Sequence, residues 1–140
     1  MKGFSLIELL MAMVVAGILA AIAVPNYIQY VTRGRIPDAT AALSDLRVRA
    51  EQWFQDNRTY VGFDVPCGST AGRHFNTACA GLTANAYEIT ATGKGTMAGF
   101  TYRITLNAAT GLVVRSTPSV PAGWTSSATC WVVKKSGSCI

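Results

Sequence analysis

The sequence predicts an α+β protein in which a long N-terminal α-helix packs on an antiparallel sheet of three to four strands. Three observations support this prediction. A long apolar run with a single charged residue opens the chain, apolar residues then recur with a helical period as far as Phe54, and segments of alternating polar and apolar residues follow from Tyr87 onward. With 140 residues, the chain has room for one soluble domain in addition to the apolar segment.

The apolar run extends from Phe4 to Pro25 and contains one ionisable side chain, Glu8. Its 22 residues would form a helix about 33 Å long, close to the thickness of a bilayer's hydrocarbon core. A cleaved secretory signal is one interpretation, because AGILAAIAVPNY supplies small residues for a cleavage site. A plain signal anchor is another, but it needs no carboxylate. A charge in a membrane-length segment is costly and usually indicates a partner or a function.

Beyond Pro25, apolar residues recur at a spacing of about 3.6 residues, and charged residues lie between them. The apolar positions are Ile28, Val31, Ala39, Ala42, Leu43, Leu46, Ala50, Trp53 and Phe54. This pattern predicts a helix from about Phe4 to Gln55, whose second half forms one wall of a globular head. Pro25 and Pro37 lack amide donors, and they predict bends or local unwinding.

The rest of the chain predicts a loop followed by a meander of strands. Residues 58–84 have no sustained period and contain several glycines, which indicates a long structured loop. AYEITAT and FTYRITL alternate polar and apolar residues and predict two strands. NAATG, ending in Gly111, predicts a hairpin connection, LVVRST a returning strand and TCWVVKK a further strand. The helix bearing Trp53 and Phe54 would cover the apolar face of this sheet.

The segment KGFSLIELL resembles the leader junction of type IV pilins, and its positions match that junction one by one. In this family a prepilin peptidase cuts after a glycine, here Gly3, and methylates the new N-terminal phenylalanine, here Phe4. The glutamate that lies five residues into the mature family members corresponds to Glu8. The resemblance therefore implies that the whole apolar run is retained after processing.

The same resemblance implies three regions. Residues 1–3 form a leader peptide that is shorter than in most members of the family; either a very short leader suffices, or the true start lies upstream of Met1. Residues 4–28 form the transmembrane and filament-core half of the helix, and residues 29–140 form the globular head. The segment RIPDATAALSDLRVRAEQWFQDNRTY additionally resembles the PilE-type pilins, many of which are minor components of pili.

The function implied by the resemblance is that of a structural subunit, major or minor, of a type IV pilus. Such a subunit would lie in the bacterial inner membrane as a single-pass protein with its head outside the cytoplasm. It would then pass into the extracellular pilus. The implied partners are the prepilin peptidase, the inner-membrane assembly platform and other pilin subunits.

Two interpretations of Glu8 follow from cleavage after Gly3. The new amine of Phe4 would lie one turn from Glu8 of the same chain, and a carboxylate in the first turn favours the helix macrodipole. The pilin resemblance implies instead that Glu8 pairs with the Phe4 amine of a neighbouring subunit. In a low dielectric either charge alone is expensive, so such a pair would set the axial stagger between subunits.

The four cysteines are Cys67, Cys79, Cys130 and Cys139, and all of them follow the apolar run. An even number in an exported domain favours disulfides, and four cysteines allow three pairings. Short loops close easily, which favours Cys67 with Cys79 and Cys130 with Cys139, although the other pairings stay open. The second pair resembles the C-terminal disulfide-bounded loop of pilins. Each bond would stabilise the head by about 2–4 kcal/mol.

The sequence does not predict catalysis or a bound cofactor. His74 is the only histidine and lies in a loop rich in glycine, serine and threonine, which is typical of a solvated side chain. A zinc site made of Cys67, His74 and Cys79 lacks the usual ligand spacing. The chain has no phosphate-binding glycine motif and no convincing carboxylate pair. We therefore expect a protein that is not an enzyme and that binds no metal.

Net charge supports an alternative function. From Thr59 onward the chain has six basic and two acidic residues, a formal charge of +4. Lys134 and Lys135, close to the last cysteine, could bind DNA electrostatically. Competence pilins of the same superfamily bind DNA during uptake, so a DNA-binding competence pilin is one alternative. A type II secretion pseudopilin is another, although the absence of an acidic calcium loop favours a pilus.

Overall fold

The computed structural model describes residues 5–68 and 70–140. The chain forms two compact units, Met1–Gly34 and Arg35–Ile140. In the first unit the structure describes the beginning of α1, a helix that extends over Leu6–Asn57. The second unit is the head, which contains the rest of α1 and all the strands.

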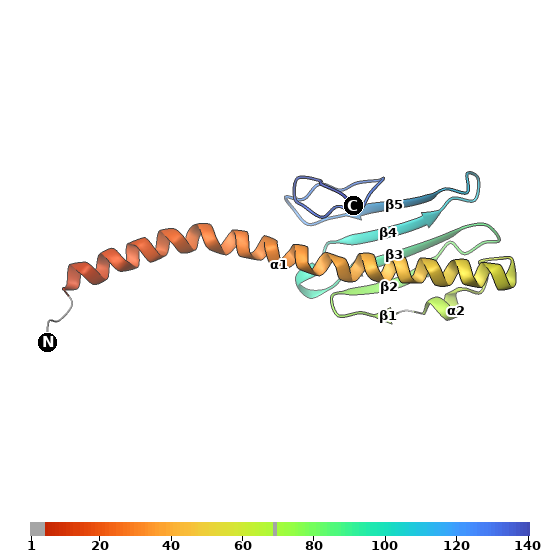
Figure 1. Ribbon diagram of the computed structural model, residues 1–140, viewed down its shortest axis with the longest axis horizontal. Helices are drawn as coiled ribbons and strands as arrows, with labels where there is room; N and C mark the ends of the chain where they lie inside the picture. The colour runs from red at the N-terminus through yellow and green to blue at the C-terminus, as the bar shows by residue number, and fades with distance from the viewer. Residues whose placement is uncertain (1–4, 69) are drawn as a thin grey trace. The chain divides into compact units, whose positions relative to one another are not determined.

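The sheet of the head is an antiparallel meander in the order β1-β2-β3-β4-β5. Its strands are β1 Thr70–Ala71, β2 Phe75–Ala80, β3 Tyr87–Gly93, β4 Thr101–Leu106 and β5 Val113–Ser119. Two short helices lie between elements: α2 (Asp64–Cys67) precedes β1, and the 3₁₀ helix η1 (Gly95–Met97) joins β3 to β4. Within the head, α1 lies across one face of the sheet (Figure 1).

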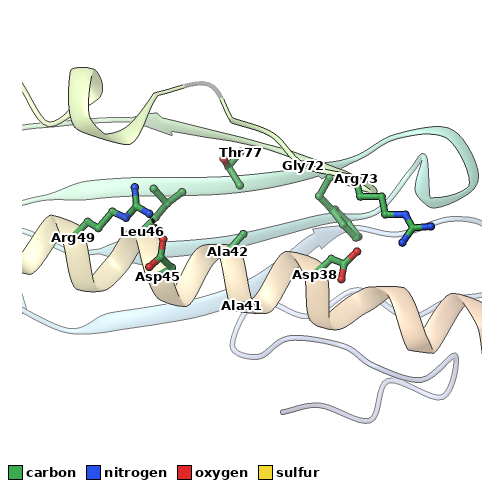
Figure 2. Close-up of a pocket in the computed structure, with 10 residues that line it drawn as sticks. Asp38, Ala41, Ala42, Asp45, Leu46, Arg49, Gly72, Arg73 and Thr77 are labelled. Atoms are coloured by element: carbon green, nitrogen blue, oxygen red, sulfur yellow. Dashed lines mark ion pairs between the residues drawn. The ribbon is translucent and has the colours of Figure 1, made fainter.

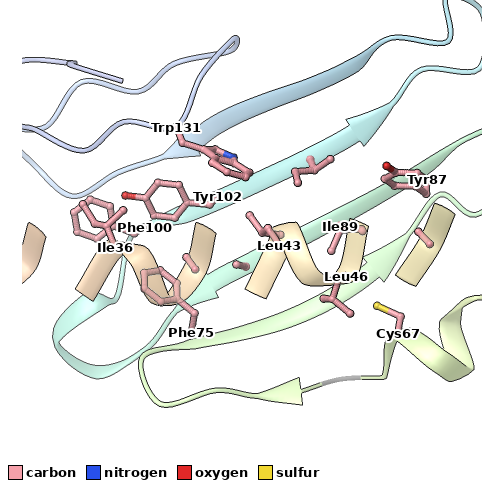
Figure 3. Packing of buried hydrophobic residues seen from close by; sticks show 14 of the residues in the cluster. Ile36, Leu43, Leu46, Cys67, Phe75, Tyr87, Ile89, Phe100, Tyr102 and Trp131 are labelled. Atoms are coloured by element: carbon pink, nitrogen blue, oxygen red, sulfur yellow. The ribbon is translucent and has the colours of Figure 1, made fainter. Parts of the chain in front are cut away.

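The core lies between α1 and the sheet, and the two-residue period of the strands determines which side chains enter it. On β3, Tyr87, Ile89 and Ala91 are buried, and on β4 the same alternation buries Tyr102 and Ile104. These side chains meet the stripe of α1 shown in Figure 3, whose buried members are Ile36, Ala39, Thr40, Leu43, Leu46 and Ala50. Removing this apolar surface from water is the main driving force for folding of the head.

The predicted α+β architecture is confirmed, whereas the predicted long loop at 58–84 is wrong over much of its length. That segment contains α2, β1 and β2, and β2 pairs with β3 along its whole length. The inward positions of β2 are Phe75, Thr77 and Cys79. Since only the first of these is strongly apolar, the alternation of FNTACA was not recognised as a strand.

The predicted strand at TCWVVKK is also wrong. In the described part of the chain this segment makes one isolated bridge, between Val132 and Cys139. Side chains attach it to the head instead: the Tyr102 hydroxyl donates a hydrogen bond to the carbonyl of Val132 at 2.9 Å. The hydroxyl of Thr117 donates a hydrogen bond to the carbonyl of Cys130 at 3.1 Å and accepts one from the backbone amide of Val132 at 2.9 Å. These side-chain hydrogen bonds satisfy backbone groups that neighbouring strands would pair with one another if the segment belonged to the sheet.

Two disulfides close the irregular parts of the head. Cys67 is joined to Cys79, with the two Cα atoms 6.3 Å apart, and this bond ties α2 to β2. Cys130 is joined to Cys139, with the Cα atoms 5.7 Å apart, and this bond closes the C-terminal segment. The structure thus contains the two short-loop pairs that the spacing favoured.

The helix α1 continues through Pro25 and Pro37 without the predicted unwinding. A proline deprives the carbonyl four residues earlier of its amide donor, which favours a break. Beside Pro37, however, Ile36 and Ala39 are almost fully buried against the head. Tertiary packing there outweighs the local cost, because unwinding would remove both side chains from the core.

Candidate functional site

The first unit has one outstanding surface, the apolar beginning of α1. Every residue from Ser5 to Ile28 is exposed. The large apolar side chains of this surface are Leu6, Ile7, Leu9, Leu10, Met11, Met13, Val14, Val15, Ile18, Leu19, Ile22, Val24 and Ile28. By length and composition, α1 is the helix of the described chain that could cross a membrane. An apolar surface of this size needs lipid or other protein helices to cover it.

Glu8 lies in the first turn of this helix. The carbonyl of Ser5 accepts hydrogen bonds from the backbone amides of Glu8 at 3.1 Å and Leu9 at 3.3 Å. Glu8 therefore belongs to the first hydrogen-bonded turn of the helix. Among the described residues, no cation forms an ion pair with Glu8. The predicted cleavage and methylation positions, Gly3 and Phe4, lie outside the described residues. The pairing of Glu8 with an amine therefore stays a prediction.

The head presents Lys134 and Lys135 in the turn of its C-terminal segment. Both side chains are exposed, and neither forms an ion pair within the part of the chain that the structure describes. The backbone around them is held in place, since the carbonyl of Lys134 accepts the amide of Gly137 at 3.0 Å. The carbonyl of Lys135 accepts the hydroxyl of Thr125 at 3.4 Å. Two neighbouring cations are thus displayed on a fixed turn.

Tertiary structure brings two arginines next to the C-terminal segment that carries these lysines. Arg47 on α1 and Arg115 on β5 both line a hollow that is also lined by Cys130 and Ile140 of the C-terminal segment. The guanidinium of Arg115 lies 5.0 Å from the centre of the Trp131 ring, a cation–π distance. Sequence reasoning missed both arginines, because positions so far apart in the chain give no local signal.

A second hollow, of about 530 Å³, lies between α1 and the β1–β2 side of the sheet (Figure 2). The small residues Ala41 and Ala42 of α1 leave space beside Phe75. Both of its carboxylates are paired: Asp45 with Arg49 at 2.9 Å, and Asp38 with His74, which lies next to the hollow, at 2.5 Å. Paired surface charges of this kind do not constitute a catalytic arrangement.

His74 differs from its predicted solvated state. Its side chain is only 19% exposed and contacts Asp38 of α1, which fixes the turn before β2 to the helix. The zinc alternative is excluded for this set of ligands, because Cys67 and Cys79 are bonded to each other and offer no thiolate. Among the described residues, no group of three or more His, Cys, Asp or Glu side chains could hold a metal ion.

A cluster of tyrosines surrounds Glu51, a residue of α1 in the head. Its carboxylate accepts hydrogen bonds from the Tyr60 hydroxyl at 3.1 Å and the Tyr87 hydroxyl at 3.3 Å. Burial, reinforced by the charge of Glu51, raises the pKa of Tyr87 to about 12 and also raises the pKa of Tyr60. Burial likewise raises the pKa of Tyr102. These hydroxyls therefore act as structural hydrogen-bond donors and stay protonated at neutral pH.

The head is expected to lose stability as the pH rises above about 10. An unfolded tyrosine ionises near pH 10, whereas the folded pKa of Tyr87 is about 12. The stability that this difference contributes is fully present below about pH 10 and is lost as the pH rises through 12. The Tm of the full chain in detergent should fall across this interval, and Tyr87→Phe should make the fall smaller. An equal fall in both proteins would contradict this assignment.

Two family models match the sequence. The model described as the prokaryotic N-terminal methylation motif matches residues 1–24. The model described as the type IV minor pilin ComP, DNA uptake sequence receptor, matches residues 25–111, which is more than half of the chain. The chain belongs to the type IV pilin family. The long helix packed on an antiparallel sheet is the architecture that the pilin resemblance implied.

Individual relatives of this pilin include both major and minor subunits. The type IV major pilin protein PilA of Myxococcus xanthus is 30% identical over 136 residues, which cover 88% of this chain and 62% of that protein. A fimbrial protein of Pseudomonas aeruginosa is 38% identical over 65 residues, covering 46% of this chain and 42% of its own length. A probable minor fimbrial protein of Dichelobacter nodosus is 37% identical over 62 residues, covering 44% and 39%. This pilin thus spans less than two thirds of each of these relatives.

Proposed function

We propose that the chain is a structural subunit of a type IV pilus, without enzymatic activity, that is anchored in the inner membrane before assembly. The observation that carries this proposal is the match of residues 1–24 to the N-terminal methylation motif, together with the exposure of every apolar side chain of α1 from Leu6 to Ile28. Residues 4–28 would be the segment that passes from lipid to the core of the filament, and residues 29–140 the head displayed at its surface.

In the proposed assembly, the prepilin peptidase removes residues 1–3 and methylates Phe4. The assembly platform then transfers the subunit into a filament of pilins. There the carboxylate of Glu8 forms an ion pair with the N-terminal amine of Phe4 of a neighbouring subunit. Two apolar helices can slide past each other at little cost, whereas a buried, mispaired carboxylate is strongly destabilising. The charge pair therefore selects one axial register among many that are equally apolar.

Mass spectrometry of sheared extracellular filaments tests this proposal. The expected N-terminal peptide begins at Phe4 and carries one methyl group on its amine. The abundance of the chain in the filaments relative to other pilins distinguishes a major from a minor subunit. A mature chain that begins after Pro25 would contradict the proposal, because no apolar helix would then remain.

A second candidate function, that of a DNA receptor within the pilus, is favoured by one specific finding. The family model that matches residues 25–111 is described as a DNA uptake sequence receptor. The head supplies a suitable charge: Lys134 and Lys135 are exposed, and Arg115 lies beside the segment that carries them. Cations that no carboxylate neutralises are the groups that bind a phosphate backbone.

The double change Lys134→Glu/Lys135→Glu is expected to weaken DNA binding. Each lysine that contacts a phosphate releases about one counterion, so the slope of log K against log salt should become shallower by about 2. Binding of the full chain to duplex DNA can be followed by fluorescence anisotropy at several salt concentrations. Binding of the unaltered chain should itself weaken as salt increases.

A matched control separates a local site from net charge. Arg73 and Lys94 are also exposed and belong to neighbouring segments, since the amide of Lys94 donates to the carbonyl of His74. Arg73→Glu/Lys94→Glu changes the net charge by the same amount next to β2 and β3, outside the C-terminal segment. If both double variants lose affinity equally, the lysine turn is not the DNA-binding surface. Absence of binding at low salt would eliminate DNA binding altogether.

A further inference from the structure

The character of α1 changes abruptly after its apolar surface. Tyr27 and Tyr30 are 69% and 77% exposed, and Arg33, three residues further on, is exposed as well. Residues three apart are neighbours on a helix surface, so each of these side chains lies next to the following one. Within the described residues, Arg33 forms no ion pair. The helix thus carries two aromatic hydroxyls and one cation immediately beyond its apolar segment.

Two other polar side chains of this stretch, Asn26 and Thr32, form hydrogen bonds with the helix itself. The side-chain amide of Asn26 donates to the carbonyl of Ile22 at 3.0 Å, and the hydroxyl of Thr32 donates to the carbonyl of Ile28 at 2.9 Å. Both bonds reach back four residues and need no water. Polar side chains satisfied in this way are tolerated where water becomes scarce, as at the boundary of a bilayer.

The spacing along the helix matches the thickness of a membrane. Tyr27 lies nineteen residues after Glu8. At 1.5 Å per residue this separation is about 28 Å, against about 30 Å for the hydrocarbon core of a bilayer. Tyrosine prefers the headgroup layer, where its ring is apolar and its hydroxyl hydrated, and arginine binds lipid phosphates. When the tyrosines lie in one headgroup layer, Glu8 reaches the other.

We propose that Tyr27, Tyr30 and Arg33 form an interfacial collar that binds the phosphate-bearing headgroup layer and sets the depth of α1 in the membrane. This inference rests on the proposed function, in which the subunit is anchored before assembly. At the depth set by the collar, the carboxylate of Glu8 lies in the opposite headgroup layer and stays hydrated. It enters a low dielectric only when the subunit leaves the membrane for the filament.

Accessibility of engineered cysteines in proteoliposomes tests the collar. The full chain is reconstituted in phosphatidylcholine and phosphatidylglycerol vesicles with single cysteine substitutions at each position from Ala21 to Arg33. Each variant is treated with a membrane-impermeant maleimide. The native cysteines are all in disulfides and do not react. Labelling is expected to begin between Pro25 and Tyr27.

Two double variants in the same scan isolate the role of the aromatic rings. Tyr27→Leu/Tyr30→Leu lengthens the apolar run, so the first labelled position should move toward the head by about four residues, one helical turn. Tyr27→Trp/Tyr30→Trp keeps an interfacial aromatic at both positions and should leave the boundary unchanged. If the first labelled position does not move in the leucine variant, although the apolar segment is still protected, the collar is overturned.

The scan also separates failure of the collar from failure of the proposed function. If cysteines placed from Ala21 to Val24 react as fast as those placed near Arg33, the helix is not embedded at all. That outcome would contradict the membrane-anchored stage itself. If the segment is protected but the first labelled position is the same with and without the two tyrosines, the collar alone is contradicted.

Discussion

Replacing Glu8 with valine is expected to leave a stable, membrane-anchored subunit that fails to enter filaments. The change removes the one ionisable side chain of the apolar run, and the remaining apolar side chains still anchor the helix in the membrane. In the proposed filament core, however, the amine of a neighbouring Phe4 would be buried without its counter-charge. Leaving one partner of a buried ion pair alone costs about 3–5 kcal/mol, equivalent to at least about a hundredfold loss of incorporation.

The ratio of this subunit in sheared filaments to that in the membrane fraction, measured by quantitative immunoblotting, reports the effect. Glu8→Gln should fail as the valine variant does, because it keeps the size of the side chain but loses the charge. Glu8→Asp keeps the charge and should retain partial incorporation. Normal incorporation of Glu8→Val would remove the glutamate from the assembly mechanism.

Gly93→Ala is expected to be the most damaging single methyl addition in the head. Gly93 ends β3, and the connection through η1 folds back over it, so that its amide donates to the carbonyl of Phe100 at 2.8 Å. A Cβ at this position would overlap the carbonyl oxygen of Met97. Backbone atoms cannot rotate away as a side chain can, so the connection that buries Met97 and Phe100 must move. A loss of about 3 kcal/mol or more is expected, at the upper end for overpacking.

Equilibrium denaturation of the full chain in detergent measures this loss, and Gly34→Ala is its matched control. Nothing lies within 4 Å of a Cβ placed on Gly34, which is helical. Alanine there should be neutral or stabilise the helix by up to about 1 kcal/mol. If Gly93→Ala unfolds at the same denaturant concentration as the unaltered chain, the tight connection over Gly93 is not a constraint on the fold.

Local pattern predicted the elements that carry a strong period. The helix was expected to end near Gln55 and ends at Asn57, because its apolar stripe is long and strongly periodic. The strands at AYEITAT and FTYRITL were found as β3 and β4, since large apolar side chains mark every second position. Strand β2 was missed for the opposite reason, as it places Thr77 toward the core with a polar side chain.

The candidate sites divide in the same way. Glu8 and the lysine turn were identified from the sequence because each is a local contrast, one charge in an apolar run and two adjacent cations. Arg47 and Arg115 come together only through the packing of α1 beside β5, which no local pattern encodes. His74 was expected in solvent but contacts Asp38, because the turn before β2 folds back onto the helix.

The sequence by itself determined that the chain has an apolar helix of membrane length with one carboxylate near its start. Composition and period suffice for this, since the helix satisfies its own backbone hydrogen bonds and needs no distant partner. Only the tertiary structure decided how the segment from Cys130 to Cys139 is held and which cations lie beside it. That segment has no period of its own, and side-chain bonds from Tyr102 and Thr117 fix it in place. Such contacts join residues distant in the chain, so they exist only once the core has formed.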